Sequence, residues 1–479
     1  MSRRAAIIGG GVIGGGWAAR FLLNGWDVAL FDPDPDAARK VDTVLENARC
    51  ALPAIYDAAL PPEGRLSFCD DVRTAVAGAD WVQESVPERL DLKHTVHAAI
   101  TNHAPAAAII GSSTSGFKPS QLNAAGARAI VAHPFNPVYL LPLVELVGDA
   151  DRCGRAAEIL RGIGMFPLTI AQEIDAHIAD RLLEAVWRES LWLVKDGIAT
   201  TQEIDDAIRM GFGLRWAQMG LFETYRIAGG EAGMKHFMAQ FGPALAWPWT
   251  KLTDVPEFDD ALVDLIAGQS DAQSGHLTIR ELEARRDTNL VGLLRALKVS
   301  RAGAGVVVRD HEAQLMRTGA RDTKARAITV DRQVPPSWTD YNGHMNEAHY
   351  LELGSQATDR LMELIGADAD YVARGFSYFT VESHLRFIAE IAAGDRVRAR
   401  TRVLGADARK LHLFHEITRG DGTEAATVET LLLHVDLNTR KSCPPPAAIA
   451  DAVQELAEQA ADLAAPEGIC LGVGGGRGG

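Results

Sequence analysis

The residues Ala5-Ala6-Ile7-Ile8-Gly9-Gly10-Gly11-Val12-Ile13-Gly14 open the chain with a short apolar run that leads into a cluster of glycines. The apolar run predicts a buried strand, and the pattern that follows predicts a helix over 17–23 and a second strand over 28–31. Strand, tight turn, helix and strand make a βαβ unit, which implies a parallel sheet. Further apolar runs at 80–84, 107–111 and 129–132 extend the pattern. We therefore expect a doubly wound α/β Rossmann domain over residues 1–180.

The glycine cluster fits the G-x-G-x-x-G pattern of dinucleotide-binding turns. Gly9 makes the turn, Gly11 lets the backbone approach a pyrophosphate, and Gly14 allows close packing of helix and strand. Val12 and Ile13 lie between them, where the amides of the helix N-terminus face the phosphates. Asp32 stands at the end of the second strand, where a carboxylate accepts both ribose hydroxyls and repels a 2′-phosphate. The sequence predicts NAD as the cofactor, and the alternative is a structural glycine turn.

Polar residues follow the later strands of this predicted sheet. Ser112-Ser113-Thr114-Ser115 comes directly after one strand, His133-Pro134-Phe135-Asn136-Pro137 ends the next, and Glu145 follows in Leu-Val-Glu-Leu. Ligands bind at this carboxyl edge in doubly wound sheets. A histidine oriented by a carboxylate can take the hydroxyl proton of an alcohol while hydride leaves for a nicotinamide. A lone loop histidine is more often structural, but the Rossmann context favours this catalytic interpretation.

Together with Ala79-Asp80-Trp81-Val82-Gln83-Glu84-Ser85-Val86-Pro87-Glu88, these motifs resemble the 3-hydroxyacyl-CoA dehydrogenase family over about residues 1–300. The resemblance implies that His133 is the general base and Glu145 its orienting partner. It also implies that Ser112 and Asn136 hydrogen-bond the reacting oxygen, and that Glu84 lies near the cofactor or the substrate.

Apolar residues recur with a helical period from Asp175 to about Leu297. We expect an all-α domain for substrate binding and dimerisation over residues 181–320. The resemblance implies that it is 6-phosphogluconate-dehydrogenase-like.

Two departures from the family bear on the substrate. Acyl-CoA-binding members carry a lysine-rich segment after the second strand, whereas residues 41–69 here hold two arginines, no lysine and four acids. The family's neutral asparagine at the start of the helical domain is replaced by Asp180, which would attract a cationic group, with Arg181 beside it for an anionic one. The alternative is that Asp180 and Arg181 form an ordinary ion pair.

Tryptophans are concentrated in the helical domain. Most aromatic residues at helical spacing belong to the core, but as a group they could form a cage for a quaternary ammonium by cation–π attraction. The candidates are Trp187, Trp192, Trp216, Trp247 and Trp249. With these features the chain resembles a CoA-independent branch of the family, the L-carnitine dehydrogenases, some of which are fused to a thioesterase. The resemblance implies NAD-dependent oxidation of L-carnitine to 3-dehydrocarnitine.

The C-terminal part has a different periodicity. Arginines at 396, 398, 400 and 402 alternate with smaller residues, which predicts an antiparallel strand with one face in water, and further strands are expected at 410–418 and 426–436. A helix is expected over 347–365. We place an α+β domain at 325–440, followed by a C-terminal helix and a disordered Gly-rich tail over 441–479.

Trp338-Thr339-Asp340-Tyr341-Asn342-Gly343-His344-Met345-Asn346 precedes that helix. A carboxylate beside a helix N-terminus can activate a water molecule, and the amide donors of the helix N-terminus can stabilise an oxyanion. The segment is similar to hot-dog-fold acyl-CoA thioesterases of the 4-hydroxybenzoyl-CoA type. The resemblance implies that Asp340 is the nucleophile or general base, that Asn346 supports it, and, from the fused enzymes, that betainyl-CoA is hydrolysed to glycine betaine. The alternative is that Asp340 caps the turn and the domain only dimerises.

Composition limits the other possibilities. The net charge of −15 repels polyanions and anionic lipids, so we expect neither nucleic acid nor membrane as a partner. The five cysteines are scattered, with no C-x-x-C pair, and no metal site is expected. Together with the absence of a signal-peptide pattern, this predicts a cytoplasmic protein, and we expect a homodimer. The competing functional hypothesis is a dehydrogenase for an acyl-CoA or for another small hydroxy acid such as L-gulonate, with a non-catalytic hot-dog domain.

Overall fold

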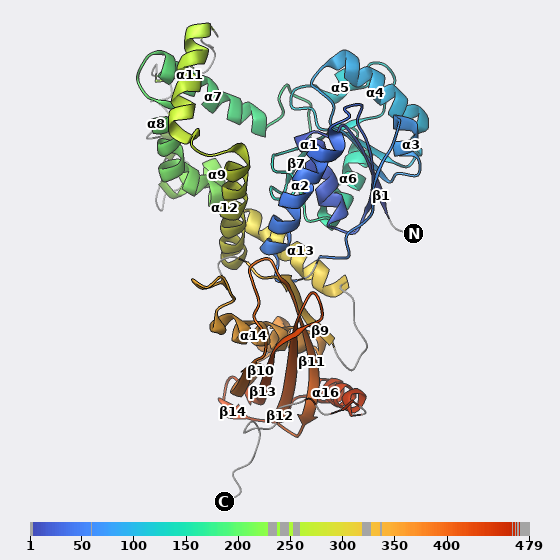
Figure 1. Cartoon of the computed structure of the whole chain (residues 1–479), viewed down its shortest axis with the longest axis vertical. Coiled ribbons are helices and arrows are strands. Elements are labelled where there is room, and N and C mark those ends of the chain that lie inside the picture. Colours follow the sequence, from blue (N-terminus) through green and yellow to red (C-terminus); the bar gives the residue numbers. More distant parts are fainter. Residues whose placement is uncertain are drawn as a thin grey trace, which may run out of the picture. The chain divides into compact units, whose positions relative to one another are not determined.

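The computed structural model describes residues 3–58, 60–228, 237–239, 249–251, 259–318, 327–335 and 338–461, together with residues 463, 464, 466 and 469. The chain divides into two compact units. The first contains Met1–Ile55 and Leu60–Ala313, and the second contains Tyr56–Ala59 and Gln314–Gly479. Figure 1 labels many of the elements of both units.

The described strands of the first unit form one sheet in the order β3-β2-β1-β4-β5-β6-β7-β8. They are β1 (Arg4–Ile8), β2 (Asp27–Phe31), β3 (Leu66–Phe68), β4 (Trp81–Glu84), β5 (Ile109–Ser112), β6 (Ile130–Pro134), β7 (Leu143–Val147) and β8 (Phe166–Thr169). Neighbours are parallel except for β6 and β7, which pair antiparallel. The predicted Rossmann sheet is confirmed, and the antiparallel pair is a feature that the sequence reading did not include.

Helices cover both faces of this sheet. They are α1 (Val12–Leu22), α2 (Ala37–Ala51), α3 (Val72–Val76), α4 (Leu90–His103), α5 (Pro119–Leu122) and α6 (Ala150–Gly162), with a 3₁₀ turn at Pro53–Ile55. Successive side chains of a strand point to opposite faces. Ile8 of β1 shares a cluster with Val76 and Ile100 of α3 and α4, whereas Ile7 lies against Gly14 of α1.

The described residues of the first unit from Ala179 onward are mainly helical. This part contains α7 (Ala179–Lys195), α8 (Thr201–Ala207), a π-helical turn at Ile208–Phe212, α9 (Gly213–Ala228), α11 (Asp260–Ser274) and α12 (Ile279–Ser300), and α13 (Ala304–Thr318) begins in it. Thr200 and Thr278 begin α8 and α12 with capping boxes, each closed by a glutamate three residues later. The predicted helical domain is therefore confirmed as a fold. In the described part of the chain, no helix has the length and apolar character needed to span a membrane.

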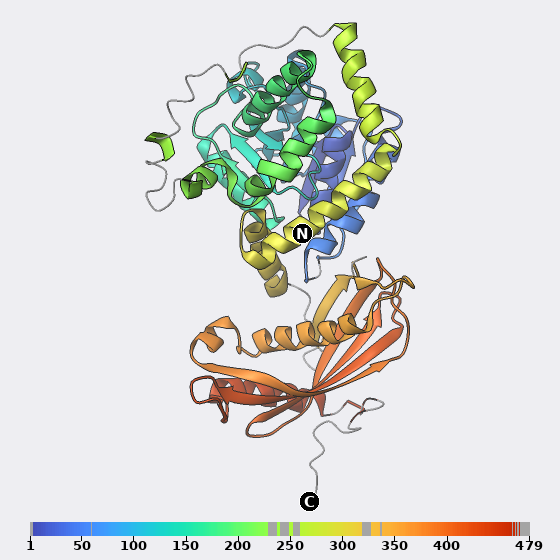
Figure 2. The same cartoon turned by 90° about the vertical axis from the view of Figure 1, so that its left-hand side faces the viewer.

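The second unit is an antiparallel sheet with a long helix on it. Its strands run in the order β10-β13-β12-β11-β9, and β14 pairs with β13. The elements are β9 (Ala327–Gln333), α14 (Glu347–Leu364), α15 (Ala369–Ala373), β10 (Phe376–Phe387), β11 (Arg396–Ala406), β12 (Lys410–Arg419), β13 (Glu424–Asp436), β14 (Lys441–Ser442) and α16 (Ala447–Ala460). Figure 2 shows α14 lying along one face of the curved sheet. Gly354 lets the helix approach closely, because a Cβ there would lie 2.8 Å from Cγ1 of Val428.

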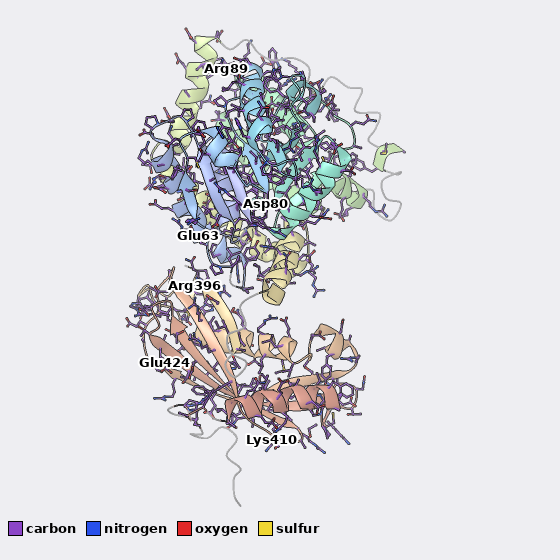
Figure 3. The ribbon with its side chains drawn as sticks, turned by 90° about the vertical axis from the view of Figure 1, so that its right-hand side faces the viewer. Glu63, Asp80, Arg89, Arg396, Lys410 and Glu424 are labelled. Carbon is purple, nitrogen blue, oxygen red and sulfur yellow. The ribbon has the colours of Figure 1, made fainter. Side chains whose placement is uncertain are left out.

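The arginine-rich strand β11 departs in one respect from the expectation of a wet face. Val397 and Ala399 face the core, as predicted, but Arg402 is buried and donates a hydrogen bond to the carbonyl of Ala464. The segment after α16 therefore covers this end of the strand. Figure 3 labels Arg396, the first residue of β11, and Lys410, the first residue of β12, toward opposite ends of the sheet. The predicted Gly-rich tail from Gly472 to Gly479 lies outside the described residues.

Candidate active sites

The turn between β1 and α1 has the geometry that a bound pyrophosphate requires. Gly9 has φ of +105°, and a Cβ on Gly14 would lie 1.8 Å from the carbonyl oxygen of Gly9, so neither position tolerates a side chain. Gly11 is different, because a Cβ there would meet nothing within 4 Å. The space beside Gly11 is open, and no side chain caps the first amides of α1, at Val12 and Ile13. Both features suit a phosphate group.

Asp32 is held beside this turn by the backbone. One carboxylate oxygen accepts the amide of Gly10 at 2.5 Å, and the other accepts the amide of Asp34 at 2.8 Å. The carboxylate therefore lies at the end of β2 next to the glycine turn, where it can accept ribose hydroxyls. The residues present fit NAD.

His133 and Glu145 meet across the antiparallel pair β6 and β7. They are directly opposite in register, and Nδ1 of His133 lies 3.1 Å from Oε2 of Glu145. The other oxygen of Glu145 accepts the amides of Ile178 and Ala179 at 3.0 and 2.9 Å. Burial alone would raise the pKa of Glu145, but hydrogen bonds from His133 and the two amides hold that pKa below its ordinary value. The structure therefore places an ionised carboxylate behind the imidazole.

The other nitrogen of His133 faces two side chains. Asp180, in the first turn of α7, has Oδ2 at 3.4 Å from Nε2 of His133, and the hydroxyl of Ser115 lies 3.3 Å from the same nitrogen. Arg181 is exposed and makes no ion pair with another described residue. The carboxylate of Asp180 thus lies next to Nε2 of His133, the atom that would take a proton. Asp180 and Arg181, both described in the structure, do not form an ion pair with each other.

The positions of Ser112 and Glu84 do not fit the roles that the sequence predicted for them. Both are fully buried, and the Ser112 hydroxyl donates to Glu84 at 2.5 Å. Lys93 and His97 hold the same carboxylate at 2.8 and 3.1 Å. Burial would raise the pKa of Glu84, but these partners lower it to about 2. Strand β5 continues through Ser112, which turns this side chain into the interior and leaves Ser115, in the loop that follows, beside His133.

Two further residues at this edge were missed by sequence reasoning. Glu88 is half-exposed, accepts hydrogen bonds from the Thr114 hydroxyl and the Gly116 amide, and pairs with Lys93 at 3.2 Å. Phe135 packs edge-on against His133 with ring centroids 4.8 Å apart. The sequence feature that could have identified Glu88 was its position in the acidic motif after β4. Asn136 is exposed, and its side chain makes no hydrogen bond with another described residue.

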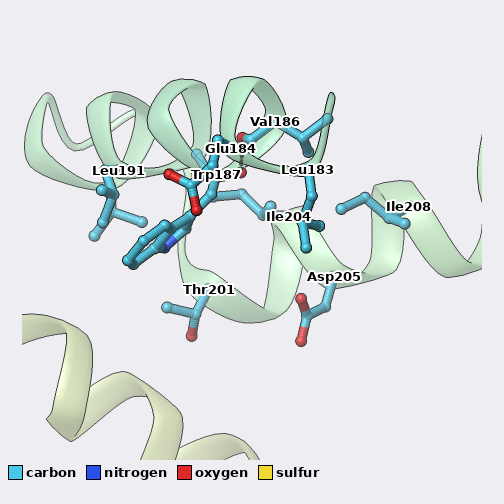
Figure 4. Close-up of a pocket in the computed structure, with 11 residues that line it drawn as sticks. Leu183, Glu184, Val186, Trp187, Leu191, Thr201, Ile204, Asp205 and Ile208 are labelled. Atoms are coloured by element: carbon cyan, nitrogen blue, oxygen red, sulfur yellow. Dashed lines mark hydrogen bonds between the residues drawn. The ribbon is translucent and has the colours of Figure 1, made fainter. Parts of the chain in front are cut away.

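The tryptophans do not converge on one cage within the described chain. Trp187 is exposed and lines a pocket of about 440 Å³ between α7 and α8, together with Glu184 and Leu191 (Figure 4). The ring of Trp192 is already faced by two cations of the chain itself, Lys251 at 4.2 Å and Lys195 at 5.0 Å.

The remaining tryptophans lie elsewhere. Trp216 packs against Phe212 at 4.6 Å, Trp249 is exposed, and Trp247 lies outside the described residues. Among the described residues, the ring of Phe135 packs against the imidazole of His133, and the cage of tryptophans stays a prediction because Trp247 lies outside the described residues.

The second candidate site lies in the loop before α14. Asp340 is half-buried and its carboxylate accepts the amide of Asn342 at 2.8 Å, while Gly343 supplies the turn with φ of +79°. Asn346 caps α14 by accepting the amide of Ala348 at 3.0 Å. The amide of Met345 donates to Ile391 at 2.7 Å, which ties the loop to the segment before β11. A carboxylate therefore stands beside a capped helix N-terminus.

Comparison with known proteins agrees with both halves. Residues 4–173 match the model of the 3-hydroxyacyl-CoA dehydrogenase NAD binding domain, and residues 177–257 match that family's C-terminal domain. Residues 334–453 match the thioesterase-like superfamily. NAD as the cofactor and the hot-dog thioesterase fold are therefore confirmed.

Individual relatives extend the agreement to nearly the whole chain. A Ruegeria pomeroyi protein named L-carnitine dehydrogenase/betainyl-CoA thioesterase is 62% identical over 476 residues, covering 97% of this chain and 98% of the relative. A Mesorhizobium japonicum L-carnitine dehydrogenase is 58% identical and covers 67% of this chain and 92% of its own length.

Among solved structures, the NAD-dependent 5-formyl-3-hydroxy-2-methylpyridine 4-carboxylic acid 5-dehydrogenase is 28% identical with a TM-score of 0.54, covering 62% of this chain and 99% of that one. The dehydrogenase half thus aligns with single-function enzymes, and the whole chain aligns with fused ones. The chain belongs to the family of L-carnitine dehydrogenase/betainyl-CoA thioesterases.

Proposed function

We propose that the first unit oxidises L-carnitine to 3-dehydrocarnitine with NAD, and that the second hydrolyses betainyl-CoA to glycine betaine. The observation that carries the first activity is the carboxylate of Asp180 at 3.4 Å from Nε2 of His133. In carnitine one methylene separates the trimethylammonium nitrogen from the carbinol carbon. A substrate whose hydroxyl reaches His133 therefore brings its positive charge next to Asp180.

His133 and Glu145 have the arrangement that alcohol oxidation needs. Glu145 accepts from Nδ1 of His133, which leaves Nε2 to take the proton of the carnitine hydroxyl. Ser115 lies where its hydroxyl can bond the same oxygen. Bound NAD supplies the hydride acceptor. Arg181, exposed one residue after Asp180, is available for the carboxylate of the substrate.

An acyl-CoA substrate fits the first unit less well. Within residues 41–69, Arg49 is engaged by Glu63 through Nε at 3.1 Å and Nη2 at 2.7 Å (Figure 3 labels Glu63). On α2, Asp42 is exposed, and Glu46 is exposed with its Oε2 at 3.8 Å from Nη2 of Arg280. Phosphate groups of CoA would meet negative charge there.

The dehydrogenase proposal is tested by measuring NADH formation from L-carnitine, 3-hydroxybutyryl-CoA and L-gulonate, each with the intact protein and NAD. We expect kcat/KM to be highest for L-carnitine by orders of magnitude. Reaction with the CoA thioester alone, or with gulonate alone, would contradict the proposal.

In the second unit, we propose that Asp340 is the nucleophile or general base for thioester cleavage. The amides at Gly343 and at the N-terminus of α14 would stabilise the oxyanion. Asp340→Asn should abolish release of CoA from betainyl-CoA and leave NAD reduction by carnitine unchanged. Asp451→Asn, an exposed aspartate of α16, is the matched control and should affect neither rate. Normal thioester cleavage by Asp340→Asn would exclude Asp340 from that role.

We also propose that the protein is a cytoplasmic homodimer. NAD and CoA thioesters are both available in the cytoplasm. The helical part of the first unit exposes large apolar side chains on α7 and α9, namely Leu182, Leu183, Trp187, Leu214, Phe222 and Ile227. A surface of this kind is typical of a protein interface, and a second copy of the same helices is the occupant that we propose.

A further inference from the structure

Two consecutive residues between β8 and α7 have a backbone conformation that side chains disfavour. Ala176 and His177 have φ of 60° and 50°, in the left-handed region. Strained backbone of this kind persists only where the surroundings fix it, and it is concentrated at functional sites. The proposed mechanism does not use either residue.

The consequence of this turn is visible at Glu145. The chain reverses so that the next two amides, of Ile178 and Ala179, both donate to one oxygen of Glu145. These are the first amides of α7, the helix that also carries Asp180. The turn therefore fixes the carboxylate that orients His133 and the start of the helix that faces its other nitrogen.

The side chain of His177 is buried between these parts. Its exposed fraction is 0%, and its ring centroid is 5.6 Å from that of His133. Nε2 lies 3.2 Å from the carbonyl oxygen of Thr114, which can only accept, so Nε2 carries the hydrogen. Nδ1 is buried and has no hydrogen-bond partner among the residues that the structure describes. Burial lowers the pKa of His177, which keeps the ring neutral beside His133.

Thr114 is the residue before Ser115, whose hydroxyl lies 3.3 Å from Nε2 of His133. The bond from His177 thus joins the loop after β5 to the segment that enters α7. We propose that His177 is a positioning residue for the oxidation, holding Ser115 and Asp180 together on the same nitrogen of His133. That the substrate of this oxidation is L-carnitine rests on the proposed function.

The experiment compares three replacements of His177 in the intact protein. His177→Phe keeps a planar ring and removes the donor, whereas His177→Gln keeps an N–H donor at a similar reach and His177→Asn has a donor that is too short. We expect His177→Phe and His177→Asn to lower kcat for L-carnitine roughly 10- to 100-fold, with KM for NAD within about twofold of the parent value. His177→Gln should recover most of the loss.

A second measurement separates positioning from a purely structural role. With L-carnitine deuterated at the carbinol carbon, the isotope effect on kcat should rise in the impaired variants, because misplacement slows the chemical step. His94→Phe is the matched control, since Nε2 of His94 also lies against a backbone carbonyl, that of Gln121 at 2.8 Å, outside the site. It should change neither kcat nor the isotope effect.

The outcomes are separable. An unchanged kcat and isotope effect in His177→Phe, or equal rates in His177→Gln and His177→Asn, would overturn the assignment of His177. The comparison of His177→Gln with His177→Asn tests the role of His177 even if His177→Phe does not fold. Absence of NADH formation by the parent with L-carnitine would instead overturn the proposed substrate.

Discussion

At the residue scale, His133 lies between two carboxylates that differ in their surroundings. Glu145 is fully buried, and its carboxylate accepts hydrogen bonds from two backbone amides and from the imidazole of His133. Its charge is therefore compensated by groups of the protein and is not accessible to a substrate. Asp180 keeps 19% of its side chain exposed, and its Oδ2 lies 3.4 Å from Nε2 of His133. The first carboxylate can orient the base, and the second remains accessible to a cation that enters with the substrate.

The two serines that follow β5 should behave differently. Ser115→Ala should lower kcat for carnitine by roughly 10²-fold, because it removes a hydroxyl beside the reacting oxygen. Ser112→Ala should leave kcat within about twofold and cost about 1 kcal/mol of stability, since it removes a buried bond to Glu84. Steady-state kinetics and chemical denaturation check both, and a larger loss of kcat in Ser112→Ala would reverse the assignment.

The buried cluster around Glu84 should give the fold a defined pH dependence. Among the described residues, Glu84→Gln leaves Glu88 as the charged partner of Lys93, and it should destabilise the fold by about 3 kcal/mol at neutral pH. The folded pKa of Glu84, about 2, is below its ordinary value of 4.5. Its ionised form therefore stabilises the fold above pH 4.5, and this contribution is lost as the pH falls toward 2.

Denaturation of the parent and Glu84→Gln from pH 7 downward measures this difference. It should be constant to about pH 4.5 and shrink below that. A difference that grows on acidification would contradict the ion-pair account.

At the element scale, the pairing of β6 with β7 explains why a histidine and a glutamate twelve residues apart are direct neighbours. The sequence predicted β1, β2, β4, β5, β6, β12 and β13, the glycine turn and the helix over 347–365 to within a few residues, because these follow from local apolar periodicity, but it did not predict β3, β7 or β8. It did not predict which serine faces His133, because this depends on where β5 ends. Nor did it predict that Lys251 covers Trp192, since that contact joins α7 to residues far along the chain.

The N-terminus of α14 offers a test at this scale. Asn346→Ala removes the side-chain cap of the helix and should lower stability of the second unit by about 1 kcal/mol, whereas Asn346→Ser should restore it. Thermal denaturation with thioesterase assays of both variants checks this. If Asn346→Ser were as unstable as Asn346→Ala, capping would not be the structural role of Asn346.

At the scale of the whole molecule, the proposed function gives the chain two catalytic units whose substrates would share a trimethylammonium group. The Mesorhizobium japonicum relative aligns with about two thirds of this chain, which is consistent with a dehydrogenase that functions without the second unit. The apolar face of α7 and α9, where Phe222 is 74% exposed, is the surface that we propose for a second copy of the chain. The described edge strand β10 likewise exposes Phe379 and Val381.

Light scattering on the intact protein should therefore give a mass of about twice the 51.5 kDa of one chain. Replacing Phe222 by Asp should weaken association through the helical face, and Lys410→Ala, at the start of β12, is a control that should not. A monomeric parent at micromolar concentration would contradict the proposed homodimer.

In the proposed oxidation, the charge of Asp180 next to His133 selects a cationic hydroxy acid. The most direct test measures KM for L-carnitine and for its uncharged isostere, with a tert-butyl group in place of trimethylammonium, in the parent, Asp180→Asn and the control Glu184→Gln. We predict that Asp180→Asn raises KM for carnitine by about tenfold or more, the value of one charge-assisted contact, and changes KM for the isostere by less than about twofold. Equal effects of Asp180→Asn on the two substrates would contradict the account.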